Sequence, residues 1–145
     1  MASALPLAAP FTFPVRIYWE DTDAGGIVFY ANYLKFFERA RTEWLRALGL
    51  GQRVLQQQSG GMFVVVDAAL KYLRPARLDD ELIVTARLQE AGRAGLVVAQ
   101  QALLADPATG QRELLCNGTI RVGWVDTASM KPARIPAPIL KQLNP

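Results

Sequence analysis

The chain has 145 residues, of which 51% are hydrophobic and 20% charged, and this length suffices for one globular domain with a sizeable core. It contains no histidine, which excludes a Ser-His-Asp triad, a Cys-His pair and the usual histidine-containing metal sites. Sixteen basic residues against 13 acidic ones give a net charge of +3, which mildly favours anionic partners. Because histidine is absent, any catalysis must use carboxylates, lysine or backbone dipoles.

The ends and the composition of the chain suggest a simple organisation. Residues 1–10 are rich in alanine and proline without a basic segment, so they do not resemble a signal peptide. We expect a flexible tail over residues 1–10 and a single domain over residues 11–145. No segment reaches the roughly 18 apolar residues of a membrane span, and no basic run or zinc-finger spacing indicates nucleic-acid binding. The prediction is a soluble cytoplasmic protein without a transmembrane segment.

The first predicted elements are a strand and a long helix. Aromatic and β-branched residues alternate with polar ones over residues 11–20, which predicts a strand, and Pro14 places its start near a sheet edge. From about residue 30 to residue 48, apolar residues recur at steps of three and four, which predicts a helix with a wide buried face. Gly49 fits the position that ends such a helix, and Asn32 could cap its start.

The rest of the chain is predicted to be mainly β-structure. Residues 51–61 form a connection with room for one helical turn, and the largely apolar run 62–72 predicts a central strand covered by the helix on one face. An antiparallel meander and a short terminal helix follow, with strands at 82–89, 96–104 and 114–124, turns at 92–95 and 106–110, and the helix within 136–143.

These elements define an α+β domain in which the sheet curls around one long helix. Exposed edges of a small sheet also predict self-association. The single cysteine, Cys116, cannot form an intramolecular disulfide and is expected to be a small apolar residue within a strand.

The segment from Glu20 to Tyr33 places carboxylates, paired glycines and a helix start within fourteen residues. Amide N–H groups in a first helical turn lack intrahelical partners and lie at the positive end of the helix dipole, so they can stabilise a developing negative charge. An acid beside such a helix start suggests chemistry on a carbonyl. Asp23 could instead cap the turn. Asp21 could raise the pKa of Asp23 by like-charge repulsion, or be a solvated turn residue.

The sequence Asp-Thr-Asp-Ala-Gly-Gly-Ile-Val-Phe-Tyr-Ala-Asn-Tyr, from residue 21, is similar to the signature of the hotdog-fold acyl-CoA thioesterases. The similarity continues through residues 37–43, 72–80 and 116–122. Within that superfamily the chain most resembles the 4-hydroxybenzoyl-CoA thioesterase family and its YbgC-like branch, which is associated with the Tol-Pal system. The resemblance implies a hotdog fold and an enzyme that hydrolyses acyl-CoA thioesters without a metal or other cofactor, coenzyme A being part of the substrate.

The resemblance assigns catalytic roles to two residues. Asp23 occupies the place of the family's catalytic carboxylate, which either attacks the thioester carbonyl or activates a water. Tyr30 occupies the position whose backbone N–H binds the thioester oxygen, and one such donor contributes about 3–4 kcal/mol to transition-state stabilisation. The Tol-Pal branch usually has histidine at this position, whereas the 4-hydroxybenzoyl-CoA enzyme has tyrosine. A packed aromatic ring at Tyr30 is compatible with the backbone role.

Substrate binding is predicted at Gly26, Arg74 and Arg77. Gly26 could allow close approach of the substrate or simply form the turn. Arg74 and Arg77 flank Pro75 at a strand end and match the family pattern, so their forked donors could bind coenzyme A phosphates, although solvated surface arginines are common.

Two further groups of residues are ambiguous. Surface or intersubunit ion pairs are expected for Glu38, Arg39, Arg41 and Glu43 of the helix. An acyl pocket or the core could hold Phe29, Phe36, Phe63 and Trp124.

The resemblance also implies a homo-oligomer, a dimer or tetramer, with active sites at the subunit boundary. A dehydratase of the same fold is disfavoured, since those enzymes use an Asp-His pair. The alternative from another class is a non-catalytic module that binds acyl-CoA or an acidic acyl carrier protein.

Overall fold

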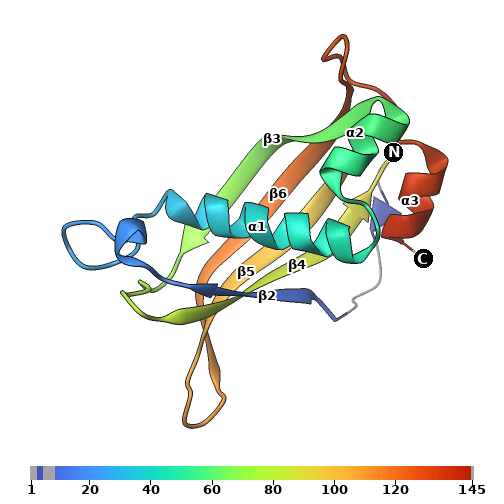
Figure 1. Ribbon diagram of the computed structural model, residues 1–145. Helices are drawn as coiled ribbons and strands as arrows, with labels where there is room; N and C mark the ends of the chain where they lie inside the picture. The colour runs from blue at the N-terminus through green and yellow to red at the C-terminus, as the bar shows by residue number, and fades with distance from the viewer. Residues whose placement is uncertain (1–2, 5–8, 145) are drawn as a thin grey trace.

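The computed structural model describes residues 3–4 and 9–144, and its centre is a long helix, α1 (Asn32–Ala47), that lies across one face of an antiparallel sheet (Figure 1). The six strands are β1 (Ser3–Ala4), β2 (Phe11–Arg16), β3 (Gly61–Tyr72), β4 (Glu81–Ala91), β5 (Gly95–Ala105) and β6 (Arg112–Asp126). The remaining elements are a 3₁₀ turn, η1 (Trp19–Asp21), and the helices α2 (Gln52–Ser59) and α3 (Ala137–Leu143). This is the α+β architecture that the periodicity predicted, with an antiparallel sheet packed around one long helix.

The strand order is β1-β4-β5-β6-β3, and β2 also pairs with β4. Strands β4, β5 and β6 follow one another as antiparallel neighbours, so the predicted meander is confirmed for them. Strand β3 pairs with β6 and not with β4, the next strand along the chain. Residues 73–80 therefore cross the end of the sheet from β3 to β4, past β6 and β5, and this crossing brings them beside the start of α1.

Helix α1 buries its apolar face against the sheet. Phe36, Phe37 and Ala40 are completely buried, and burying one such aromatic side chain stabilises the fold by about 1.5–3 kcal/mol. Gly49, with φ of +80°, follows the last turn as predicted. Asn32 is not the cap, because it is the first helical residue and its side-chain amide donates instead to the Asp21 carbonyl at 2.9 Å.

The first long strand is shorter than predicted. It ends at Arg16, and the 3₁₀ turn replaces its last residues. The Asp21 carboxylate accepts the Tyr18 amide at 2.8 Å, and the Thr22 hydroxyl donates to the Trp19 carbonyl, also at 2.8 Å. These local side-chain bonds compete with strand pairing, and Trp19 in the turn is 83% exposed.

Strand β3 lies at a sheet edge, whereas the sequence predicted a central strand. Within the described part of the chain it pairs only with β6, so its outer edge is unpaired. A register shift between Val65 and Asp67 marks a bulge, and Val65 and Val66 are 51% and 60% exposed. An apolar run cannot distinguish a strand covered by its own chain from one that another chain covers.

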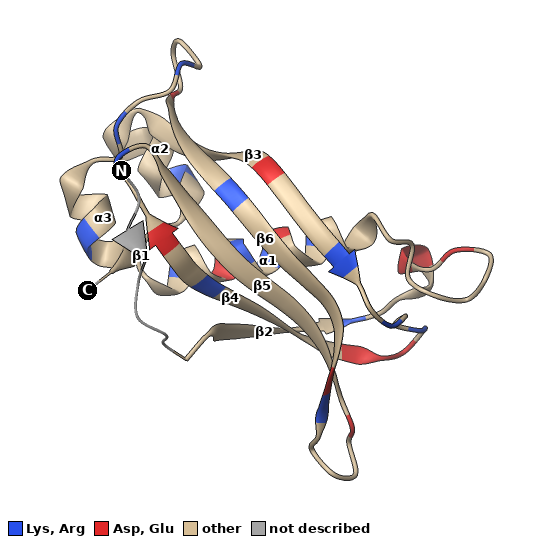
Figure 2. Cartoon of the chain, turned by 180° about the vertical axis from the view of Figure 1, so that it is seen from behind, with Lys and Arg blue, Asp and Glu red and all other residues tan. Residues whose placement is uncertain are grey.

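The smaller elements refine the remaining predictions. Helix α2 has eight residues and thus two turns rather than one, and α3 confirms the predicted terminal helix. Most of the predicted tail lies outside the described residues, but Ser3 and Ala4 pair with Ala91 and Glu90 of β4. The described helices include none that is long and apolar enough to cross a membrane. Charged residues of both signs are dispersed along the strands of the sheet, as the view from behind shows (Figure 2).

Gly118 of β6 permits close packing of α1, because a methyl group at this position would lie 2.6 Å from Cε2 of Phe37. Phe37 is fully buried, so its ring cannot move without disturbing the core. We expect Gly118→Ala to lower the free energy of unfolding by about 1–3 kcal/mol, measured by chemical denaturation.

The matched control is Gly51→Ala, where the added methyl group meets open space. This change should alter the free energy of unfolding by less than about 1 kcal/mol. Equal stabilities of the two variants would show that the helix does not pack tightly on β6.

Candidate active site

A tight turn over Asp23–Ile27 projects from the end of the molecule at which α1 begins (Figure 1). Thr22 and Val28 form an antiparallel bridge at its base, and the Asp23 amide donates to the Ile27 carbonyl at 2.8 Å. Gly26 has φ of +80°, a conformation that residues with a side chain rarely adopt. The predicted turn is therefore confirmed, and Gly26 is a turn residue.

The side chain of Asp23 is exposed on this turn. Its Oδ1 accepts the Gly25 amide at 2.9 Å, so the turn-capping interaction considered from the sequence is present. A Cβ at Gly25 would lie 3.2 Å from the same oxygen, so glycine leaves the carboxylate room. No other described residue hydrogen-bonds this carboxylate, and its second oxygen is open to a reactant.

Asp21 ties the turn to the start of α1. Its carbonyl accepts both the Phe29 amide and the Asn32 side-chain amide, each at 2.9 Å. Its carboxylate accepts the Tyr18 amide. Of the two roles considered for Asp21, the geometry supports that of a turn residue.

The start of α1 has no side-chain cap. The N-cap residue is Ala31, and the first turn contains no acidic residue. The described residues provide no acceptor for the Tyr30 backbone N–H, which lies just before the helix. An unpaired amide at the positive end of a helix dipole can bind a polarised or anionic oxygen, as the sequence suggested.

An apolar cleft of about 300 Å³ adjoins Tyr30. It lies between the turn, the start of α1 and the segment that follows β3, and it is lined by Ile27, Val28, Tyr30, Tyr33, Tyr72, Leu73, Arg74 and Pro75. The crossing segment forms one wall, because the Val28 amide donates to the Ala76 carbonyl at 2.9 Å.

Two tyrosines fix the shape of this cleft. The Tyr72 hydroxyl donates to the Tyr30 carbonyl at 2.9 Å, and the Tyr33 hydroxyl accepts the Ala76 amide at 3.3 Å. The Tyr33 and Tyr72 rings pack edge to face with centroids 5.6 Å apart. Burial raises the pKa of both phenols, so both stay protonated at neutral pH. The backbone of Tyr30 is thereby held in one position.

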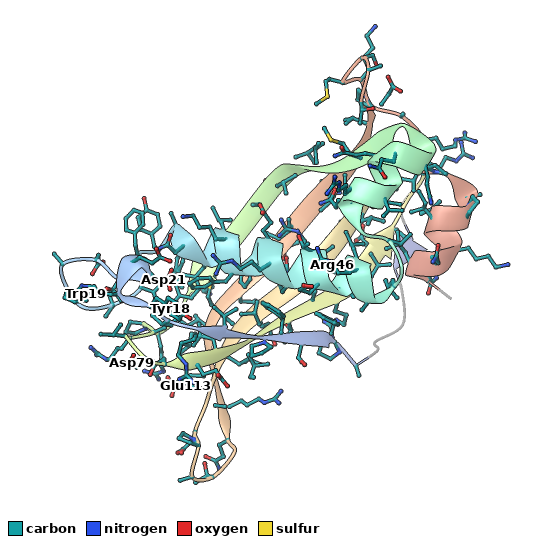
Figure 3. All side chains as sticks on the ribbon, in the orientation of Figure 1. Tyr18, Trp19, Asp21, Arg46, Asp79 and Glu113 are labelled. Atoms are coloured by element: carbon teal, nitrogen blue, oxygen red, sulfur yellow. The ribbon has the colours of Figure 1, made fainter. Side chains whose placement is uncertain are left out.

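The two predicted phosphate-binding arginines lie beside the turn but differ in availability. Arg74 forms an ion pair with Glu113, with Nε 3.1 Å from Oε1. Figure 3 shows Glu113 toward the end of the molecule that holds Asp21, whereas Arg46 lies at the far end of α1. Arg77 forms a backbone bridge with Ile27, and its exposed guanidinium has no hydrogen-bond partner among the described residues.

Residues 17–143, most of the chain, match the family model described as the thioesterase-like superfamily. The chain belongs to the thioesterase-like superfamily. The acyl-CoA thioesterase YbgC of Haemophilus influenzae is 42% identical over 126 residues, which are 87% of this chain and 88% of that protein. The acyl-CoA thioester hydrolase YbgC of Escherichia coli O6:H1 is 39% identical over 134 residues, 92% and 96% of the two chains.

A solved structure confirms the fold of this thioesterase-like protein. The 4-hydroxybenzoyl CoA thioesterase from Pseudomonas sp. strain CBS-3 superposes with a TM-score of 0.84 at 22% sequence identity. The match covers 93% of this chain and 99% of that one. At this identity the likeness shows the hotdog fold alone.

The thioesterase-like chain also contains a polar cluster that the sequence analysis missed. Gln100 is completely buried, and its Nε2 donates to the carbonyls of Phe37 at 3.0 Å and Thr85 at 3.1 Å. Its Oε1 accepts from Nη1 of Arg41 at 2.9 Å. Of the two expectations for Arg41, an ion pair on the surface of its own chain is wrong, because Arg41 is half-buried and bound to a neutral amide, and an ion pair between subunits stays a prediction. The available signal was the pair Gln100-Gln101 within the otherwise apolar run of β5.

The aromatic residues divide differently from the prediction. Phe36, Phe63 and Trp124 are buried in the core, while Phe29 is 44% exposed. Of the helix charges, Glu43 forms the expected ion pair, with Arg46 as its partner. The cleft instead uses tyrosines that the periodicity assigned to the helix and to a strand end.

Cys116 is completely buried in β6, and burial raises the pKa of its thiol to about 12. The predicted structural role is confirmed. Residues 3–4 and 9–144 include no group of three acidic or cysteine side chains placed to hold a metal ion.

We expect native Cys116 to resist alkylation by iodoacetamide at pH 8, because the thiol is inaccessible and almost entirely protonated. Unfolding in guanidinium should return the thiol pKa to about 8.5 and permit rapid modification. Mass spectrometry of timed samples measures both rates. Fast modification of the native protein would show that β6 opens readily.

Proposed function

We propose that the protein hydrolyses acyl-CoA thioesters to a free acid and coenzyme A. The observation that carries this proposal is the unpaired Tyr30 amide at the uncapped start of α1, with the exposed Asp23 carboxylate on a turn anchored to the same helix start. Relatives named as acyl-CoA thioesterases, 42% and 39% identical over most of their lengths, support the same substrate class.

In the proposed reaction the thioester oxygen accepts the Tyr30 N–H. This bond strengthens as the carbonyl becomes an oxyanion, and one such donor lowers the barrier by about 3–4 kcal/mol. Asp23 acts in one of two ways. It attacks the carbonyl carbon, expels the coenzyme A thiolate and leaves an anhydride that water hydrolyses, or it takes a proton from a water that attacks instead.

Substrate binding would use the surroundings of the turn. The exposed guanidinium of Arg77 is open to a coenzyme A phosphate, and Arg74 could exchange its exposed ion pair with Glu113 for another phosphate. Gly26 leaves open space beside the turn for the thioester.

We propose that a second copy of the chain completes the site. The unpaired edge of β3 exposes Val65 and Val66, and such an edge is a template for pairing with another strand. A two-fold pairing of β3 with β3 is antiparallel, so the start of one strand lies beside the end of the other. Phe63 of one copy would then approach the partner's Tyr72, which holds the partner's Tyr30 in place.

Some expectations remain predictions from the sequence resemblance. These are the pairing of dimers into tetramers, a cytoplasmic location, an acyl carrier protein as partner and the association with the Tol-Pal system.

We expect Asp23→Asn to lower kcat by about 10²–10⁴, because the amide can neither attack the carbonyl nor accept a proton. The measurement is thiol release from a panel of aliphatic and aromatic acyl-CoA esters. Circular dichroism and thermal denaturation should be unchanged, since Asn can still accept the Gly25 amide.

The control is Asp106→Asn, which alters an exposed turn carboxylate between β5 and β6 that accepts the Ala108 amide. It should keep wild-type activity. Binding of the esters without turnover by the wild type would favour the non-catalytic module.

Dimer formation through β3 predicts that Val66→Lys shifts the protein toward a monomer and lowers activity, because the pairing would place a charge from each copy in the shared interface. Size-exclusion chromatography with light scattering measures the mass. Val54→Lys, at a 45% exposed position on α2, should leave mass and activity unchanged. A wild-type monomer with full activity would contradict the shared site.

A further inference from the structure

A second cavity, of about 190 Å³, lies between α1, α2 and the first half of β3. Its floor is apolar and includes the buried side chains of Phe63, Val98 and Val122. Arg41 and Thr42 of α1 provide polar groups on its wall. A pocket of this size accommodates roughly five or six non-hydrogen atoms.

Gln100 fixes the guanidinium of Arg41 on this wall. Both hydrogens of its amide are used by the carbonyls of Phe37 and Thr85, so its oxygen must face Arg41. An arginine that is simply solvated at the surface does not need a buried side chain to orient its guanidinium. Burying a glutamine is costly unless its polar atoms are paired, and here they are all paired.

Arg41 forms no ion pair within 4 Å among the described residues, whose ion pairs involve Arg16, Arg46 and Arg74. Burial lowers the pKa of Arg41 and the nearby Glu38 carboxylate acts in the opposite direction, and the guanidinium remains protonated at neutral pH. One of its five N–H groups binds Gln100, which leaves four donors for a ligand. The planar arrangement of these donors suits a carboxylate.

The cavity lies within reach of the proposed reaction centre. Arg41 is roughly 12 Å along α1 from Tyr33 of its own cleft, at about 1.5 Å of rise per residue, so a six-carbon acyl group would reach the cavity from the partner's cleft and not from that of the same chain. The cavity residues Phe63 and Val65 belong to β3, and the proposed pairing of β3 edges sets this side of the cavity beside the partner's Tyr72. An acyl group bound at the partner's Tyr30 amide could therefore extend into the cavity.

We propose that this cavity receives the far end of the acyl group and that Arg41, positioned by Gln100, selects acyl groups ending in a carboxylate. The proposal rests on the thioesterase function and the dimer proposed above. The size of the cavity favours a dicarboxylic acyl group of about six carbons. Glu38 also lines the rim and would repel a carboxylate, but it is exposed and its charge is screened by solvent.

The test compares adipyl-CoA with hexanoyl-CoA, which have the same chain length and differ in a terminal carboxylate or methyl group. We expect wild-type kcat/KM to be at least about tenfold higher for adipyl-CoA. Arg41→Met should lower the adipyl-to-hexanoyl ratio by about 10- to 100-fold, because the charged hydrogen bonds are lost. The charge-matched control, Arg39→Met, alters an exposed arginine of the same helix and should keep the wild-type ratio.

Gln100→Leu tests the positioning role. It should lower the same ratio, whereas a purely structural glutamine would lower the rates for both esters equally. Thermal denaturation identifies any variant that fails to fold. If Gln100→Leu does not fold, the comparison of the two esters with Arg41→Met, a change at a half-buried position, tests the proposal.

Three results would overturn the proposal while leaving the thioesterase function intact. These are a wild-type preference for hexanoyl-CoA, an equal loss of both activities in Arg41→Met, and dissociation of the dimer in that variant, which would assign Arg41 to an interface ion pair. Absence of turnover with every ester would refute the thioesterase function itself. In that case adipate, but not hexanoate, should still raise the Tm of the wild type, and adipate should not raise the Tm of Arg41→Met. If adipate does not shift the wild-type Tm either, carboxylate binding in the cavity is refuted as well.

Discussion

The packing of α1 against the sheet fixes the position of an uncapped helix start, at the end of the molecule from which the turn of residues 23–27 projects. Phe36, Phe37 and Ala40 are completely buried, so the helix axis cannot shift without exposing a large apolar area. The first turn, in contrast, has no capping side chain. Burial of the apolar face therefore stabilises the helix although the Tyr30 N–H at its start has no hydrogen-bond partner among the described residues. An oxyanion is the ligand that such a helix start binds best.

The topology then gathers the rest of the candidate site around that helix end. Because β3 pairs with β6 rather than with β4, residues 73–80 must cross the end of the sheet. The crossing brings Ala76 against Val28 and Arg77 against Ile27, so a glycine turn and an arginine-containing segment share one cleft. Hydrogen bonds of Asp21 to Asn32 and of Tyr72 to Tyr30 fix the backbone beside this cleft.

The same topology leaves one long edge of the sheet unpaired. A strand that exposes Val65 and Val66 at its centre favours self-association, and that association would join the cleft of one copy to the cavity beside Arg41 of another. The buried Gln100 has a place in this arrangement. It links the helix, β4 and Arg41 through fully paired polar atoms, which gives the guanidinium a defined direction in the cavity wall.

The sequence by itself determined the long helix, the β4–β6 meander, the glycine turn and the structural role of Cys116, because these follow from local periodicity, turn chemistry and composition. It also singled out Asp23 and Tyr30 as candidates, since their motif is contiguous, and the family resemblance added Arg77. Only the tertiary structure decided that β3 is an edge strand, that Tyr72 supports Tyr30 and that Gln100 orients Arg41. The hydrogen bonds of Tyr72 to Tyr30 and of Arg41 to Gln100 join residues 42 and 59 positions apart. Hydrophobic patterning predicts that a residue is buried but not which part of the fold, or which partner, buries it.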